Sequence, residues 1–258
     1  MKTLKEIFAY REMIFSLVRK DLRGRYLGSV LGFLWTFINP LLQLIVYSVV
    51  FSIIMRAGIE KYYLFLFVAL IPWIFFGSCL TGGAGAILGE PALITKIYFP
   101  REVLPIAFVT SCFVNMLLCF VVVFAVVLIS GVAVNPLLWL YLPPIMIVEY
   151  IMGLGVAMAA SAITVYFRDL QHILGILQMA WMFLTPVMYG TDTVPEEVLP
   201  IFYMNPMTSV ITAYRDVLYY AKAPEIETFL QAVIFGAVIL VVGFFLFGRL
   251  KRGFAEEL

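Results

Sequence analysis

Six long apolar stretches restrict this chain to one class of structure. They run over about residues 30–55, 63–88, 103–130, 138–166, 173–189 and 229–247. Each is close to the roughly 20 residues that a helix needs to cross the hydrocarbon core of a bilayer. Because 64% of the 258 residues are hydrophobic, an ordinary water-soluble domain is excluded. We therefore expect an all-α integral membrane protein with six transmembrane helices.

The spans form one expected transmembrane domain, residues 30–250, flanked by two shorter regions. Residues 1–29 combine many basic side chains with apolar ones, such as Ile7 and Leu17, at near-helical spacing. This pattern predicts an amphipathic interfacial helix in the headgroup region, attracted by anionic lipid. A solvated basic tail is the alternative, but the apolar face persists for several turns. Residues 251–258 are expected to form a cytoplasmic tail.

The distribution of Lys and Arg predicts the orientation in the membrane. If the N-terminus is cytoplasmic, thirteen of the 17 Lys and Arg residues fall on the inner side. The four on the outer side are Arg56, Lys61, Arg215 and Lys222. Cytoplasmic loops are enriched in these residue types. We therefore expect a multi-pass protein of the plasma or inner membrane with both termini in the cytoplasm.

The connection Leu88–Pro105 is too polar to remain in hydrocarbon. Pro91 suits the first turn of a helix, whereas Pro100 disfavours helical geometry at Phe99. Apolar side chains between the two prolines recur at helical spacing, which predicts a short amphipathic helix over Glu90–Tyr98 on the cytoplasmic face. A short interfacial helix that can move as a unit suits a membrane protein that is driven by a separate partner protein. An ordinary tight loop is the alternative.

The outer segment Gly190–Thr228 is long for a connector and keeps apolar content. Asn205 and Pro206 break it in the middle, and Thr208 or Ser209 can cap a second short helix after the break. Two apolar half-helices around a proline break are typical of a re-entrant helical hairpin buried in protein or lining a cavity. We expect a gate at the outer mouth, with a folded cap that has no gating role as the alternative.

The sequence offers little for covalent chemistry. It has one histidine, His172, no GxxxxGK[ST] phosphate loop, and no HExxH or paired-cysteine spacing for a metal. We expect no ATP hydrolysis by this chain, no enzyme activity and no metal site. One acid, Glu149, lies inside the fourth span, where an acid is a candidate proton or substrate site. We favour the plainer interpretation, in which Glu149 is neutral or hydrogen-bonded to a neighbouring helix.

Four stretches, in order along nearly the whole chain, resemble one family. RYLGSVLGFLWTFINPLLQLIVYSVVFS (Arg25–Ser52) and KIYFPREVLP (Lys96–Pro105) are similar to signatures of type-2 ABC transporter (ABC-2) permeases that export polysaccharides. FRDLQHILGILQMAWMFLTPVMY (Phe167–Tyr189) and NPMTSVITAYRD (Asn205–Asp216) continue the resemblance. The branch resembled is the one that exports O-antigen, capsule and teichoic acid.

The resemblance implies a permease that moves a polyprenyl-pyrophosphate-linked polysaccharide or wall teichoic acid from the cytoplasm to the outer side of the membrane. It implies a homodimer with two copies of a separate ATPase, which would hold ATP and Mg, while this chain holds no cofactor. The glycan would pass along the dimer interface between spans one and five. The expected partners are a second copy, the ATPase, the lipid-linked glycan and membrane lipids, with no nucleic acid.

The resemblance also assigns roles to residues of this sequence. The residues expected to couple the permease to the ATPase are Glu90, Leu93, Ile94, Lys96, Ile97, Tyr98, Arg101 and Glu102. The residues expected at the cytoplasmic entrance, on the ground of position and charge, are Lys20, Arg23 and Arg25. The residues expected at the outer gate are Phe202, Tyr203, Asn205, Pro206, Tyr214 and Arg215.

Three other functions remain open from the sequence. An ABC-2 permease for a small lipid or drug would share the architecture. An ion-coupled lipid-sugar flippase would need no ATPase, but inverted repeats and several buried charges are its expected signs, and neither is visible. A membrane scaffold without transport activity is disfavoured by the proline-bounded cytoplasmic helix and the broken outer hairpin.

Overall fold

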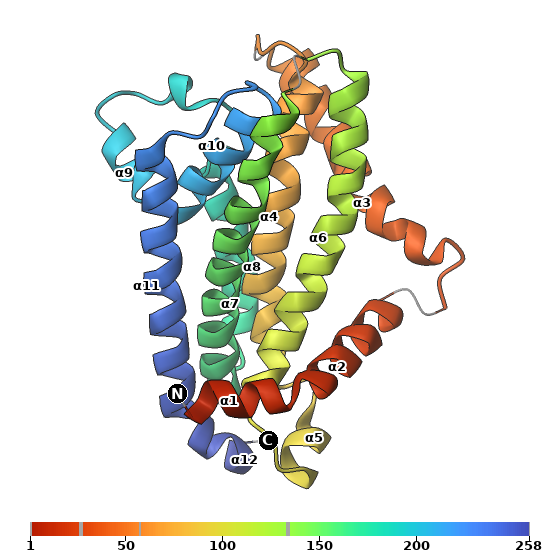
Figure 1. Ribbon diagram of the computed structural model, residues 1–258, viewed down its shortest axis with the longest axis vertical. Coiled ribbons are helices and arrows are strands. Elements are labelled where there is room, and N and C mark those ends of the chain that lie inside the picture. The colour runs from red at the N-terminus through yellow and green to blue at the C-terminus, as the bar shows by residue number, and fades with distance from the viewer. Residues whose placement is uncertain (1, 26–27, 57, 133–134, 258) are drawn as a thin grey trace.

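The computed structural model describes residues 2–25, 28–56, 58–132 and 135–257. Every regular element in these ranges is a helix. The longest are α4 (Tyr62–Ala84), α6 (Val103–Ile129), α7 (Leu142–Tyr166) and α11 (Ile226–Leu250). They run side by side along the long axis of the molecule, and α3 (Trp35–Ser48) lies obliquely beside them (Figure 1). The chain is therefore an all-α bundle, as the apolar stretches predict.

Five helical runs within the described residues are long and apolar enough to cross a membrane. They are Gly32–Ile54, Tyr62–Ala84, Val103–Ile129, Pro136–Tyr166 and Ile226–Glu257. The first joins a 3-10 turn (Gly32–Leu34), α3 and a π-helical end (Val49–Ile54). The fourth begins with a 3-10 helix (Pro136–Tyr141) that leads into α7. Each run corresponds to one of the expected spans.

The remaining expected span, about residues 173–189, is only partly helical. Helix α8 (Leu170–Phe183) is apolar but has 14 residues, and the chain turns after it. Pro186 lacks a backbone N–H and disfavours helical geometry at Thr185, which explains the early end. The described structure therefore has five long runs and this shorter apolar helix.

The N-terminal region forms two helices rather than one over residues 1–29. Helix α1 (Lys2–Ala9) and helix α2 (Arg11–Gly24) meet at Tyr10. Tyr10 has φ −94° and ψ 18°, outside the helical range, so the helix is interrupted there. Two shorter amphipathic segments therefore replace the single expected helix.

Helix α4 lies at the centre of the bundle. Its side chains are apolar all round, and Phe65, Phe67 and Phe76 are fully buried. Helices α3 and α11 instead expose apolar side chains such as Ile45 and Phe245. A helix that is apolar all round is typical of a buried position, whereas exposed apolar faces fit contact with lipid or with another membrane helix.

Helices α7 and α11 approach each other closely at two glycines. A Cβ atom on Gly155 would lie 2.6 Å from the carbonyl carbon of Ile239, and a Cβ on Gly243 would collide with the carbonyl oxygen of Gly155. Small residues let the backbones of membrane helices come this near. The pair therefore forms one closely packed unit.

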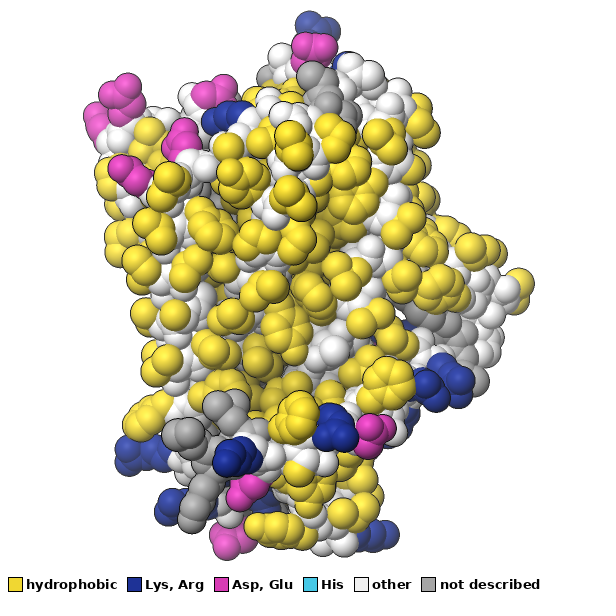
Figure 2. Space-filling model, viewed as in Figure 1, with side chains coloured by type: hydrophobic (Ala, Val, Ile, Leu, Met, Phe, Trp, Pro, Cys, Tyr) yellow, Lys and Arg dark blue, Asp and Glu magenta, His cyan; other side chains and the backbone are white. Residues whose placement is uncertain are grey.

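The two ends of the bundle carry different elements. Both termini lie at one end, here called the terminal end, together with α1, α2, α5 (Pro91–Lys96) and α12 (Phe254–Glu257) (Figure 1). The opposite end carries α9 (Leu199–Tyr203) and α10 (Pro206–Leu218). Figure 2 shows Lys and Arg gathered around the terminal end, with a hydrophobic band between the ends.

Candidate functional site

The connection between α4 and α6, residues 85–102, is called the coupling segment here. Pro91 takes the first position of α5, where its missing N–H is not needed. The helix covers Pro91–Lys96 rather than Glu90–Tyr98, because Ile97 is already extended, with φ −128° and ψ 135°. The short helix therefore exists, between the two prolines, but is shorter than the spacing predicts.

The faces of the coupling segment differ in accessibility. Ile94 is 7% exposed and packs into an apolar cluster of the terminal end, and Leu93 is half-buried beside it. Lys96, Ile97 and Tyr98 are exposed, and Tyr98 is 96% exposed. The Leu93–Ile94 face therefore belongs to the interior of this chain, and the three exposed residues are open to a separate protein.

The N-terminal helices hold the start of the coupling segment. Glu90 directly precedes α5, and its Oε1 lies 2.5 Å from Nζ of Lys20 on α2. The hydroxyl of Tyr10, between α1 and α2, donates a hydrogen bond to the carbonyl oxygen of Tyr98 at 3.4 Å. The amphipathic helices and the coupling segment therefore contact one another directly.

Arg101 and Glu102, at the end of the coupling segment, are engaged within the chain. Glu102 is 3% exposed, and its Oε1 lies 2.5 Å from Nζ of Lys251. Arg101 donates a hydrogen bond from Nη1 to the carbonyl oxygen of Lys251. These two side chains bind the C-terminal segment of the same chain.

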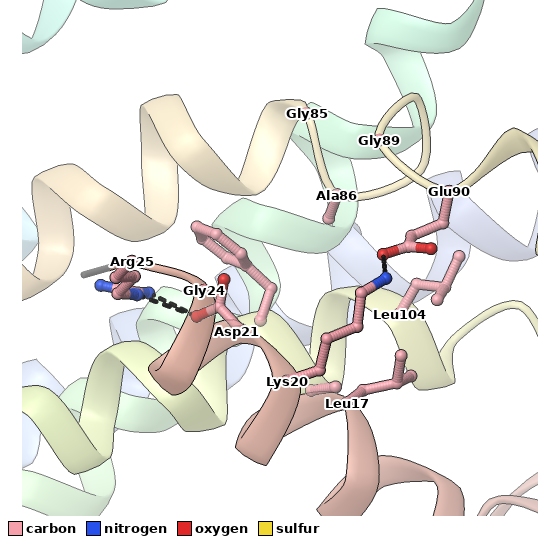
Figure 3. Close-up of a pocket in the computed structure, with 12 residues that line it drawn as sticks. Leu17, Lys20, Asp21, Gly24, Arg25, Gly85, Ala86, Gly89, Glu90 and Leu104 are labelled. Atoms are coloured by element: carbon pink, nitrogen blue, oxygen red, sulfur yellow. Dashed lines mark hydrogen bonds and ion pairs between the residues drawn. The ribbon is translucent and has the colours of Figure 1, made fainter. Parts of the chain in front are cut away.

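A cavity of about 590 Å³ lies between α2, α6 and the coupling segment (Figure 3). Its residues are Leu17, Lys20, Asp21, Gly24, Arg25, Gly85, Ala86, Gly89, Glu90, Leu104, Ala107 and Phe108. Several of these residues have no side chain beyond a methyl group, which leaves the space open. Figure 3 shows two ion pairs at its rim, Lys20 with Glu90 and Arg25 with Asp21.

Two of the three expected entrance cations line this cavity. Arg25 lies 2.9 Å from Asp21 and also reaches Ser111 Oγ at 3.2 Å. Burial alone would lower the pKa of Arg25, but Cys112 and Asp21 outweigh it, so its pKa lies above the usual range and its charge is kept. Arg23 is exposed and does not line the cavity.

Helices α9 and α10, at the end opposite the termini, are called the outer hairpin here, and Asn205 directly precedes α10. Its Oδ1 accepts a hydrogen bond from the backbone N–H of Met207 at 3.1 Å, and Pro206 takes the first helical position. The N-cap is therefore Asn205, and not Thr208 or Ser209, which already lie inside α10. Proline is favoured at the first position because its fixed φ suits a helix start.

Asn205 also ties the hairpin to α8. Its Oδ1 accepts from Nε1 of Trp181 at 2.9 Å, and its Nδ2 donates to Thr185 Oγ1 at 2.8 Å and to the carbonyl oxygen of Leu184 at 3.0 Å. One side chain therefore caps α10 and holds the end of α8.

Of the two aromatic residues before this break, Phe202 is buried and Tyr203 is half-buried. The ring centroid of Phe202 lies 6.0 Å from that of Tyr189. The carbonyl oxygen of Tyr203 accepts a hydrogen bond from Nε2 of Gln231 on α11 at 2.5 Å. Helix α9 is therefore held against both the turn after α8 and α11.

Arg215 of α10 is a buried cation that binds backbone oxygens. It donates to the carbonyl oxygens of Val187 at 2.6 Å, Tyr189 at 3.1 Å and Phe65 at 3.4 Å. The guanidinium also lies 3.6 Å from the centroid of the Phe65 ring. Because these partners come from the turn after α8 and from α4, Arg215 fastens the outer hairpin to the centre of the bundle.

Glu149 of α7 is fully buried and contacts the same hairpin. Its Oε2 accepts a hydrogen bond from the hydroxyl of Tyr214 on α10 at 2.7 Å. Tyr214 is also fully buried, with its ring 5.4 Å from that of Phe120. The structure therefore joins the intramembrane acid to an outer-gate candidate.

Comparison with known proteins places the chain in a protein family. Residues 12–219 match the ABC-2 type transporter family, which is more than half of the chain. The chain belongs to the ABC-2 type transporter family. Membership makes it the multi-pass membrane permease subunit of an ABC transporter, which works with a separate ATPase subunit.

Three relatives show how far the similarity of this ABC-2 permease extends. It is 36% identical over 265 residues to the O-antigen export system permease protein RfbA of Myxococcus xanthus, covering 100% of both chains. RfbA of Klebsiella pneumoniae is 32% identical over 96% of this chain and 95% of its own. The polysialic acid transport protein KpsM of Escherichia coli is 23% identical over 90% of this chain and 91% of its own.

Four further residues of this ABC-2 permease have structural roles that its sequence does not predict. Trp181 and Thr185 bind Asn205, Lys251 binds Glu102, and Phe254 is fully buried at the terminal end. The Asn-Pro pair was an available signal for the start of α10. No local sequence pattern predicts the other contacts, because the residues that make them are distant in the sequence.

Proposed function

We propose that this permease exports a polysaccharide of the O-antigen or capsule type, carried on polyprenyl pyrophosphate, from the cytoplasm to the outer side of the membrane. The observation that carries the proposal is the similarity, over the full length of both chains, to an O-antigen export permease. The relative that transports polysialic acid adds a capsule-type polysaccharide to the same group. ATP and Mg belong to the ATPase subunit.

The proposed topology has six crossings with both termini in the cytoplasm. Helix α8 and the turn after it, up to Tyr189, make the fifth crossing. The gathering of Lys and Arg at the terminal end supports this orientation, because such residues are enriched on the cytoplasmic side (Figure 2). The coupling segment then faces the compartment that contains the ATPase.

The proposed assembly is a homodimer with two ATPase subunits. Helices α3 and α8 support it, because both leave apolar side chains uncovered, such as Ile45 and Val46 on α3 and Ile176 and Leu177 on α8. A second copy placed against these faces would form the channel between spans one and five of each chain. The other exposed helices would face lipid.

The proposed contact with the ATPase is the exposed part of the coupling segment, Lys96, Ile97 and Tyr98. ATP binding closes the ATPase dimer and moves the coupling segment, and the helices joined to it reorient to open the channel. ATP shifts this equilibrium only as far as it binds one conformation better than the other. Hydrolysis resets the permease.

The two ends of the proposed path are the cavity and the outer hairpin. Lys20 and Arg25, with Arg23 nearby, would meet the lipid-linked pyrophosphate at the cytoplasmic entrance. Both cavity cations now pair with carboxylates, and phosphate oxygens are suitable replacements for these partners. At the outer side, α9 and α10 would form the gate, held shut by Asn205 and Arg215.

A bacterial strain that lacks its own O-antigen permease and ATPase tests this proposal. Expression of this chain with its cognate ATPase should restore polysaccharide at the cell surface, and expression without the ATPase should not. Accumulation of the polysaccharide inside cells, although the two proteins assemble, would contradict the proposed substrate and favour a small lipid or drug. Surface polysaccharide without the ATPase would instead point to an ion-coupled flippase.

A further inference from the structure

The C-terminal segment, residues 251–257, packs beside the coupling segment (Figure 1). It forms a 3-10 turn (Lys251–Gly253) followed by α12. Phe254 is fully buried in the same apolar cluster as Ile94 and Phe99 of the coupling segment. The side chain of Ile94 is therefore packed in a core that the C-terminal segment completes.

Polar contacts join the same two segments. Nζ of Lys251 lies 2.5 Å from Oε1 of Glu102, which is 3% exposed, and the carbonyl oxygen of Lys251 accepts a hydrogen bond from Arg101. The guanidinium of Arg101 also lies 5.8 Å from the centroid of the Phe254 ring. If Lys251 moved away, the buried carboxylate of Glu102 would lose its cation, so the contact resists separation.

The C-terminal segment is also fastened to α7 and α11. The ring of Tyr166, the last residue of α7, packs against that of Phe254, with centroids 6.3 Å apart. The Phe254 ring packs edge-on against Phe247 of α11, with centroids 5.5 Å apart and an interplanar angle of 87°. Because α7 and α11 meet closely at Gly155 and Gly243, the C-terminal segment is attached to a stiff pair of helices.

The direct connections of α5 along the chain are less rigid. Residues 85–89, between α4 and α5, form turns and include Gly85 and Gly89. Residues 97–102, between α5 and α6, are extended or in turns. A displacement of α5 is therefore transmitted less directly through these linkers than through the packed contact of Ile94 with the cluster around Phe254.

We propose that residues 251–257 clamp the coupling segment to α7 and α11, so that the ATP-driven displacement of α5 reaches these two helices as well as α4 and α6. Lys251 and Phe254 are then positioning residues for energy coupling. The inference rests on the proposed function. It adds α7 and α11 to the moving parts, and α7 carries Glu149, which contacts the outer hairpin.

Cross-linking across the clamp tests this inference. In the double variant Lys251→Cys with Glu102→Cys, the ion pair is absent, and export per ATP hydrolysed should fall by about fivefold or more. A short thiol-reactive cross-linker between the two new cysteines should restore this ratio, because the clamp moves as one unit. Position 102 is as buried as the native Cys79, Cys112 and Cys119, so the three native cysteines are replaced by alanine and the new pair supplies the only thiols.

A second variant separates coupling from folding. Phe254→Ala should lower export per ATP hydrolysed while the ATPase still co-purifies and hydrolyses ATP, and Phe254→Leu should recover most of the ratio. Val238→Ala is the matched control, because Val238 lies on α11, is 53% exposed and precedes the clamp by more than three helical turns. If Phe254→Ala prevents folding, the export ratio of the double cysteine variant, with and without the cross-linker, tests the proposal instead.

Two results would contradict the clamp and leave the proposed function intact. One is a wild-type ratio of export to ATP hydrolysis in the double variant without the cross-linker, and the other is loss of export on cross-linking. Loss of export would mean that the coupling segment must leave the C-terminal segment during the cycle. If the wild-type complex itself hydrolyses ATP without exporting polysaccharide, the proposed function fails and the clamp fails with it.

Discussion

At the residue scale, Arg215 shows how a charge is kept in the interior of this protein. Three of its nitrogens donate to three backbone carbonyl oxygens, and the ring of Phe65 covers one face of the guanidinium. A planar fork of donors suits this arrangement, whereas a lysine has a single point charge on a flexible stem. The same side chain holds two segments that the sequence separates widely, the start of α4 and the turn after α8.

We predict that Arg215→Lys destabilises the outer end of the bundle. Lysine cannot reach all three carbonyl oxygens, and a hydrogen bond to a charged group is worth about 1.5–3 kcal/mol, so we expect a loss of about 2–3 kcal/mol. Thermal unfolding of the purified protein in detergent measures the change. Glu197→Gln is the control, because Glu197 is exposed in the segment that precedes α9 at the same end of the bundle. Equal effects of the two variants would contradict the role of Arg215.

At the element scale, the pair α7–α11 depends on the absence of side chains at Gly155 and Gly243. Each Cβ would meet backbone atoms of the facing helix, which cannot move aside as a flexible side chain does. The two helices must separate to accept even a methyl group. This pair is also the unit to which the C-terminal segment is attached.

We therefore predict that Gly155→Ala and Gly243→Ala each lower stability by about 1–3 kcal/mol, the usual cost of overpacking. Gly248→Ala on the same helix should be neutral or slightly stabilising, because a Cβ there has nothing within 4 Å and alanine favours the helix. Thermal unfolding and resistance to protease distinguish the three variants. An unaffected Gly243→Ala variant would refute the close packing.

The sequence predicts some elements well and others poorly, for physical reasons. The long spans follow from apolar runs alone, and the short helix α5 follows from its bounding prolines. The length of α8 does not, because the apolar run continues through Pro186 into a turn. The local sequence pattern also cannot predict that the Ile94 side chain points inward, because its partners, Phe254 among them, lie far along the chain. The ion pair between Glu102 and Lys251 joins residues 149 positions apart.

At the scale of the whole molecule, Lys and Arg are concentrated at one end (Figure 2). Lys and Arg side chains surround the terminal end, where the amphipathic helices, the coupling segment and the C-terminal segment meet (Figure 2). The opposite end carries the outer hairpin, with several Asp and Glu side chains in view. Such an arrangement favours one orientation in a bilayer.

We predict that the two ends label from opposite sides of the membrane. In intact cells, a membrane-impermeant maleimide should modify Glu197→Cys, before α9, and not Lys96→Cys, at the end of α5. Both positions are exposed, so permeabilised cells that lack the ATPase should label at both positions and serve as the control. Labelling of Lys96→Cys in intact cells would reverse the proposed topology.

The measurement that tests the proposed function most directly is ATP-dependent uptake of lipid-linked polysaccharide into inverted membrane vesicles that contain this permease and its ATPase. We predict uptake that requires both the ATPase and ATP, and that falls when Tyr98→Ala weakens the contact with the ATPase. Uptake that persists without the ATPase, follows an ion gradient and is abolished by Glu149→Gln would contradict ATP-driven export and make Glu149 the central residue.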